Sequence, residues 1–216
     1  MTNEFLILLW SAASIGFVHT ILGPDHYLPF IVIGKARNWN QSRILGLTAV
    51  CGIGHVLSSV LIGMFGIFIG IQLQKLTWLE GIRGNLAAWG LIAFGLLYAI
   101  WGLRHYFRHK KKINGSHKHS TTSDATPWML FIVFFLGPCE PLIPLLMYPA
   151  AHESTMAIVL VTTIFGVVTI GTMLIAVWAA SLGLSRINMN RLQPLSHFVA
   201  GIIIFVSGLS IQFLGL

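Results

Sequence analysis

Residues 4–34, EFLILLWSAASIGFVHTILGPDHYLPFIVIG, form an apolar run of 31 residues that is interrupted by Gly23-Pro24-Asp25-His26. About 20 helical residues are enough to cross a hydrocarbon core about 30 Å thick, so this run is too long for one straight span. Proline lacks an N–H and clashes with the preceding turn, and glycine adds backbone freedom. The stretch therefore predicts a transmembrane helix that is broken at Gly23-Pro24. Carbonyl groups freed by the break must lie inside protein or beside a wet cavity.

The composition of the whole chain points to the same class of protein. The 216 residues are 56% hydrophobic and only 9% charged, with a mean hydropathy of +0.82. Too few polar side chains remain to cover a water-soluble domain, which excludes a conventional soluble enzyme and a disordered chain. The sequence contains no glycine-rich phosphate loop, so we expect no enzymatic activity and no nucleotide as the energy source.

Six apolar runs are long enough to span a bilayer, which predicts an all-α polytopic membrane protein. The predicted spans are Glu4 to Gly34, Ile44 to Leu73, Leu86 to Tyr106, Pro127 to Ala150, Met156 to Leu184 and Leu195 to Leu216. Alternate gaps between them hold 11 and 2 of the Lys and Arg residues. By the positive-inside rule the basic gaps are cytoplasmic, so the net charge of +7 indicates topology rather than nucleic-acid binding. We expect a multi-pass protein of the plasma (inner) membrane with both termini outside.

A hydrophilic segment divides the chain near its middle. Residues 108–126, RHKKKINGSHKHSTTSDAT, separate a first three-helix unit, 1–107, from a second, 127–216. The histidines in and before this segment are His105, His109, His117 and His119. They could collect metal ions weakly, but a solvated cytoplasmic loop is the simpler interpretation.

The two units are related by an internal repeat. A shift of 114 residues places Gly23-Pro24-Asp25-His26 on Gly137-Pro138-Cys139-Glu140, and a shift of 113 aligns the glycines of the third and sixth runs. Because three helices per unit is an odd number, the second unit enters the membrane from the opposite side. This predicts a 3+3 inverted repeat with helices one and four broken at Gly-Pro, as in many secondary transporters.

Metal-ligating residue types gather at the two predicted breaks. The candidates are His19, Asp25, His26, His55, Cys139 and Glu140. Ionisable groups deep in a membrane cost at least about 2.5 kcal/mol each on insertion scales and mark functional sites. Imidazole, carboxylate and thiol donors together suit nickel, cobalt or zinc rather than calcium or magnesium. Taken singly, His55 could instead bond to a neighbouring helix, and Glu140 could pair with a histidine.

At these residues the chain resembles the nickel/cobalt permease superfamily, which includes the NicO, NiCoT, HupE/UreJ and UreH-type membrane proteins. His19-Thr-Ile-Leu-Gly-Pro-Asp25-His26 is similar to their first-helix signature, and Gly54-His55-Val-Leu-Ser58 and Gly137-Pro138-Cys139-Glu140-Pro141 are similar to later segments. The resemblance implies that His19, Asp25, His26 and His55 bind the transported ion. The chain also has a wider likeness to CcdA/DsbD-type thiol-electron carriers, although Asp25 stands where a second repeat-related cysteine is expected.

The sequence therefore predicts a secondary transporter of Ni²⁺ or Co²⁺, with Zn²⁺ as an alternative, working by alternating access around a midplane site. We expect no permanent cofactor, and a metallochaperone or metalloenzyme maturation system as a partner. Histidine protonation should oppose metal binding near pH 6 to 7. Two alternatives stay open: a transmembrane thiol-disulfide electron carrier using Cys51 and Cys139, and an anion exporter, which would have no use for Asp25.

Overall fold

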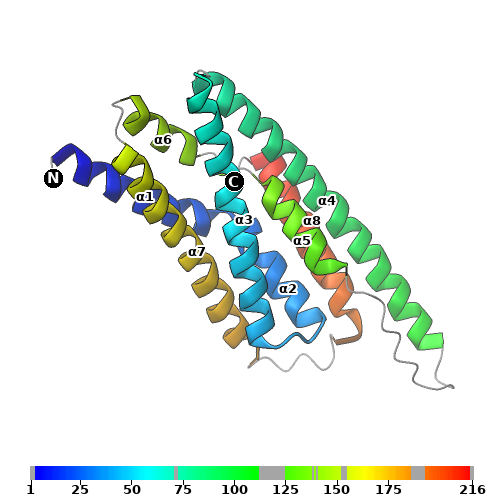
Figure 1. The fold of residues 1–216 in the computed structure, drawn as a ribbon. Coiled ribbons are helices and arrows are strands. Elements are labelled where there is room, and N and C mark those ends of the chain that lie inside the picture. Colours follow the sequence, from blue (N-terminus) through cyan, green and yellow to red (C-terminus); the bar gives the residue numbers. More distant parts are fainter. Residues whose placement is uncertain are drawn as a thin grey trace.

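The computed structural model describes residues 3–70, 73–111, 125–137, 139, 141–151, 155–185 and 193–214, and within these ranges the regular structure is entirely helical (Figure 1). The all-α prediction is thereby confirmed. In chain order the elements are α1 (Asn3–Leu22), η1 (Pro24–His26), α2 (Leu28–Ala36), α3 (Gln41–Phe68), α4 (Leu73–Lys111), α5 (Thr126–Leu136), α6 (Leu142–Ala151), α7 (Thr155–Ser185), η2 (Gln193–Leu195) and α8 (Ser196–Leu214).

The first apolar run is divided between α1, η1 and α2. The amide of Gly23 donates to the His19 carbonyl at 3.0 Å and closes the last turn of α1. Pro24, Asp25 and His26 then form one 3-10 turn, and α2 starts again at Leu28 with Pro29 in its first turn. Proline at this position is tolerated because the first amides of a helix have no partner within the helix. Asp25 and His26 therefore lie between two helix ends rather than inside a continuous helix.

Five described helices, α1, α3, α4, α7 and α8, are long and apolar enough to cross a membrane. The prediction of six such spans is not met as stated, because the run from Pro127 to Ala150 is divided into α5 and α6. Neither of these two short helices reaches the 18-residue length of a candidate span. Many large apolar side chains, including Trp10, Phe68 and Phe213, lie exposed on the helices. Such surfaces suit lipid rather than water, so the protein is a multi-pass membrane protein.

Helix α4 differs from the predicted third span at both ends. It begins at Leu73 and continues to Lys111, whereas hydropathy indicated only Leu86 to Tyr106. Lys75 and Arg83, predicted to lie in an external loop, are helical residues, and so is Arg108 of the predicted hydrophilic segment. Residues 112–124 of that segment lie outside the described part. The prediction failed at the start of α4 because Arg83 pairs with a buried Glu80, which hydropathy alone cannot show.

The contacts between helices repeat with the offset seen in the sequence. At the α4–α8 crossing, a Cβ placed on Gly95 would lie 2.4 Å from the Phe205 amide nitrogen, and one on Gly208 would lie 2.9 Å from that of Ile92. Residues 95 and 92 differ from 208 and 205 by 113. Between α3 and α7, a Cβ on Gly52 would meet Ile170 at 3.3 Å, and one on Gly166 would meet Val56 at 3.3 Å. Here the offset is 114. In both examples, the glycine and its neighbour occupy repeat-related positions, but the glycine belongs to the first unit in one contact and to the second unit in the other.

Candidate metal site

The break in the first apolar run gathers three histidines. His19 lies in the last turn of α1, His26 in η1 and His55 near the middle of α3. The ring centroids of His19 and His26 are 4.8 Å apart, and those of His26 and His55 are 5.1 Å apart. One ring nitrogen from each residue lies within 4.8 Å of the other two. Two nitrogens on one ion lie at most about 4.2 Å apart at metal–nitrogen distances of about 2.1 Å, so a bound ion would draw the rings slightly together.

Hydrogen bonds indicate that Nδ1 carries a proton in two of these imidazoles, His26 and His55. The Nδ1 of His55 is 3.3 Å from the Phe134 carbonyl oxygen, which can only accept, so Nδ1 carries the proton. The Nδ1 of His26 likewise faces two acceptors, the Gly23 carbonyl and an Asp25 carboxylate oxygen, each at 3.1 Å. When such a ring is neutral, its lone pair lies on Nε2. The Nε2 atoms of His19, His26 and His55 are all buried and have no hydrogen-bond partner.

A cavity of about 400 Å³ lies beside the cluster and is lined in part by the three histidines. Its polar lining comes from the three histidines, Asp25, Asn85 of α4 and Gln212 of α8. A water molecule takes about 30 Å³, so the cavity has room for an ion together with several waters. Buried polar atoms normally have hydrogen-bond partners, so three unpartnered nitrogens in one cluster make these residues the candidate site.

Asp25 stands behind His26 rather than among the ligand atoms. Its side chain is 31% exposed, and one oxygen accepts from His26. Carboxylates in this position orient a metal-binding histidine and increase its basicity. Asp25 also lines the cavity, and its role as a direct ligand stays a prediction.

The second Gly-Pro segment does not join the histidine cluster through Cys139. This residue is fully buried in an apolar cluster with Leu142, Leu146 and Phe165. Its backbone N–H donates to the Ser59 hydroxyl at 3.1 Å. The other predicted ligand of this segment, Glu140, lies outside the described residues, as does Pro138.

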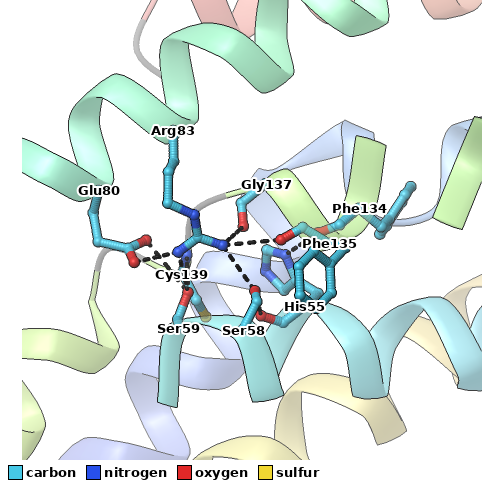
Figure 2. Close-up of polar contacts among 9 residues, drawn as sticks. All are labelled: His55, Ser58, Ser59, Glu80, Arg83, Phe134, Phe135, Gly137 and Cys139. Carbon is cyan, nitrogen blue, oxygen red and sulfur yellow. Dashed lines mark hydrogen bonds and ion pairs between the residues drawn. The ribbon is translucent and has the colours of Figure 1, made fainter. Parts of the chain in front are cut away.

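An ion pair that the sequence did not predict lies at this second segment (Figure 2). Glu80 and Arg83 are one turn apart on α4 and bond to each other. The Glu80 side chain is fully buried and that of Arg83 is 11% exposed. Ser59 also donates to Glu80, at 3.3 Å. The sequence feature that could have predicted this ion pair is the spacing of three residues between Glu80 and Arg83, which places opposite charges on one helix face.

The two cysteines have no bond to each other. Both are free and fully buried. Cys51 packs in a cluster with Met173 and Val177, whereas Cys139 belongs to the separate cluster described above.

The apolar helices define a multi-pass membrane protein, and a cavity lies at the break in its first apolar run. A family model described as "Cytochrome C biogenesis protein transmembrane region" matches residues 28–210, and the chain belongs to this family. The match confirms the wider likeness to CcdA/DsbD-type proteins and does not support the nickel/cobalt permease assignment. It includes His55 and both cysteines but starts after His19, Asp25 and His26. No curated protein and no solved structure matches the chain.

Proposed function

We propose that this protein is a secondary transporter of a divalent transition-metal ion, Ni²⁺ or Co²⁺, and that the ion is held by His19, His26 and His55. The observation that carries the proposal is the cluster of three histidines beside one cavity, each with a buried Nε2 atom that has no hydrogen-bond partner. Neutral imidazoles are borderline donors that select first-row transition ions over Mg²⁺ and Ca²⁺. A protein that only needed to fill its core would have no use for three such atoms.

The ligand set also favours release of the ion. In the described residues the group of possible ligands consists of three imidazoles and contains no thiolate or carboxylate. Such a site binds less tightly than one with charged ligands, and the cavity lets the ion keep part of its water. A carrier needs this moderate affinity, because a substrate that cannot leave is not transported.

The repeated helix contacts support alternating access. Gly95 of the first unit lies against Phe205 of the second, and Gly208 of the second unit lies against Ile92 of the first. A pseudo-two-fold axis between the units would produce this pair of contacts. We infer a 3+3 inverted repeat in which the two units rock about the histidine site, with both termini outside and the energy supplied by an ion gradient. A metallochaperone or metalloenzyme maturation system is the partner that this cargo implies.

The test is metal binding by the purified protein in detergent. The loop-histidine background carries asparagine at residues 105 and 109 near the end of α4 and at residues 117 and 119 of the hydrophilic segment, so that these four histidines cannot bind the ion. We expect saturable Ni²⁺ binding by isothermal titration calorimetry and a loss of at least tenfold in His26→Ala and His55→Ala. The matched control is His197→Ala, a half-buried histidine of α8 outside the cluster. Equal affinity in His55→Ala and the parent protein would reject the site.

The family match favours a second function, a transmembrane thiol-disulfide electron carrier. In this mechanism the thiols of Cys51 and Cys139 would form one disulfide and pass two electrons and two protons to a thiol-disulfide acceptor. The bond requires the two Cα atoms to come within about 7 Å, and the two residues pack in separate clusters. This function would therefore require a rearrangement of the helices.

Thiol trapping distinguishes the two functions. Cells expressing the protein are quenched with acid, alkylated and analysed by mass shift, with and without a membrane-permeant reductant. An electron carrier shows an oxidised form that the reductant removes. A metal transporter keeps both thiols reduced, and the variant with Cys51→Ser and Cys139→Ser still binds Ni²⁺.

A further inference from the structure

Arg83 is a buried cation that the proposed transport site does not use directly. It lies on α4, and Figure 2 shows its guanidinium between α3 and the end of α5. One terminal nitrogen bonds to Glu80 and to the Ser59 hydroxyl, the latter at 3.3 Å. The other donates to the Ser58 hydroxyl at 2.8 Å and to the carbonyl oxygens of Phe135 and Gly137 at 2.9 and 3.3 Å.

The two carbonyl contacts explain why an arginine is needed here. The last carbonyls of a helix have no amide partner within the helix, and α5 ends at Leu136, directly before Gly137-Pro138. Proline has no N–H to offer, so these carbonyls need a donor from another part of the protein. The planar guanidinium carries enough donors to bond both carbonyls, Ser58 and Glu80 together, which an ammonium on a lysine cannot do in the same geometry.

The same helix end also holds His55. The carbonyl of Phe134, one residue before Phe135, accepts from the His55 Nδ1 at 3.3 Å. A second connection runs through Ser58, whose hydroxyl accepts from Arg83 and donates to the His55 carbonyl at 2.9 Å. Arg83 is thus connected to His55 in two ways: through the end of α5, which bonds the imidazole, and through Ser58, which bonds the His55 carbonyl.

We propose that Arg83, neutralised by Glu80, is a positioning residue for the transport site. It holds the end of α5 so that the Phe134 carbonyl keeps the proton of His55 on Nδ1 and leaves Nε2 free to bind the ion. This inference rests on the proposed metal-binding function. It assigns the second Gly-Pro segment the task of orienting a ligand on α3, whereas the first segment supplies ligands itself. Groups that orient a metal-binding histidine typically change metal affinity by about 10- to 100-fold when removed.

The experiment is a double-mutant cycle on metal affinity. Replacing Glu80 and Arg83 together by glutamine removes both charges, so no unpaired charge is left buried. This variant, His55→Ala and their combination are titrated in the loop-histidine background with Cu²⁺, the first-row divalent ion that binds nitrogen donors most tightly, so that weak sites stay measurable. Ser58→Ala is the milder companion variant. Lys35→Met removes a comparable link, the Lys35 contact with the Leu184 carbonyl at 3.2 Å, far from the histidines, and serves as control.

We expect the paired glutamine variant to bind Cu²⁺ about 10- to 100-fold more weakly than the parent, with Ser58→Ala weaker in the same direction and Lys35→Met unchanged. In the His55→Ala background the glutamine pair should cause no further loss, because its effect passes through His55. Retained affinity in a folded glutamine variant overturns the positioning role and leaves the metal site intact. If the glutamine pair weakens Cu²⁺ binding equally in the His55→Ala background, the positioning role is also overturned, because the effect then does not pass through His55. Full affinity in His55→Ala alone overturns the proposed function and the inference with it.

Discussion

Gly201 at the crossing of α4 and α8 offers a stability prediction whose size follows from the structure. A Cβ at this position would lie 2.3 Å from the amide nitrogen of Ala99, 2.6 Å from its Cα and 2.7 Å from its Cβ. Ordinary van der Waals contact begins at 3.4 Å. Gly201→Ala therefore requires the helices to separate by about 1.1 Å (3.4 − 2.3), because a backbone cannot rotate out of the way.

Overpacking of this kind typically lowers the free energy of unfolding by about 1–3 kcal/mol. Because the obstacle is backbone, we expect Gly201→Ala to lose about 3 kcal/mol, the upper end of that range. For a chain of this length 1 kcal/mol shifts the melting temperature by roughly 2–4 °C, so we expect a decrease of about 6–12 °C. The separation also displaces the cavity wall, because Ala88, Leu91, Ile211 and Gln212 lie on these two helices. Ni²⁺ affinity should fall with stability.

The assay is thermal unfolding in detergent, followed by circular dichroism at 222 nm. The matched control is Gly171→Ala on α7, where an added Cβ meets nothing within 4 Å. That variant should be unchanged or gain up to about 1 kcal/mol, since alanine is the better helix former. If Gly201→Ala melts within 2 °C of the parent, the close backbone approach of α4 and α8 is refuted.

Three further predictions concern the site. Asp25→Asn should lower Ni²⁺ affinity about 10- to 100-fold without loss of folding, because the amide is a weaker acceptor for His26; calorimetry showing parental affinity contradicts the orienting role. Metal affinity should fall as the pH is lowered, because protons compete with the ion for the imidazole nitrogens, and an affinity that does not change with pH argues for other ligands. Ser59→Ala should destabilise the protein by about 1–3 kcal/mol, since Glu80 loses a donor and the Cys139 amide loses its acceptor. A melting temperature equal to that of the parent would show that another group replaces the hydroxyl.

The sequence by itself determined the class of protein and the place of the first site. Apolar runs of membrane-spanning length require helices, because a bilayer offers no water to pair with backbone groups. The Gly23-Pro24 pair marks the place where α1 ends, and His19 and His26 beside it supply two of the three imidazoles of the cluster. These properties are local: they depend on side-chain type and on spacing along one segment.

Only the tertiary structure decided how the residues are used. It brings His55 of α3 to His19 and His26, places Asp25 behind His26, and keeps Cys139 in a separate apolar cluster. It also shows that Arg83 is a buried partner of Glu80 and of the α5 carbonyls rather than a residue of an external loop. The physical reason is that a charge or a polar nitrogen is stable in an apolar interior only through partners from other helices, and hydropathy along the chain carries no record of those partners.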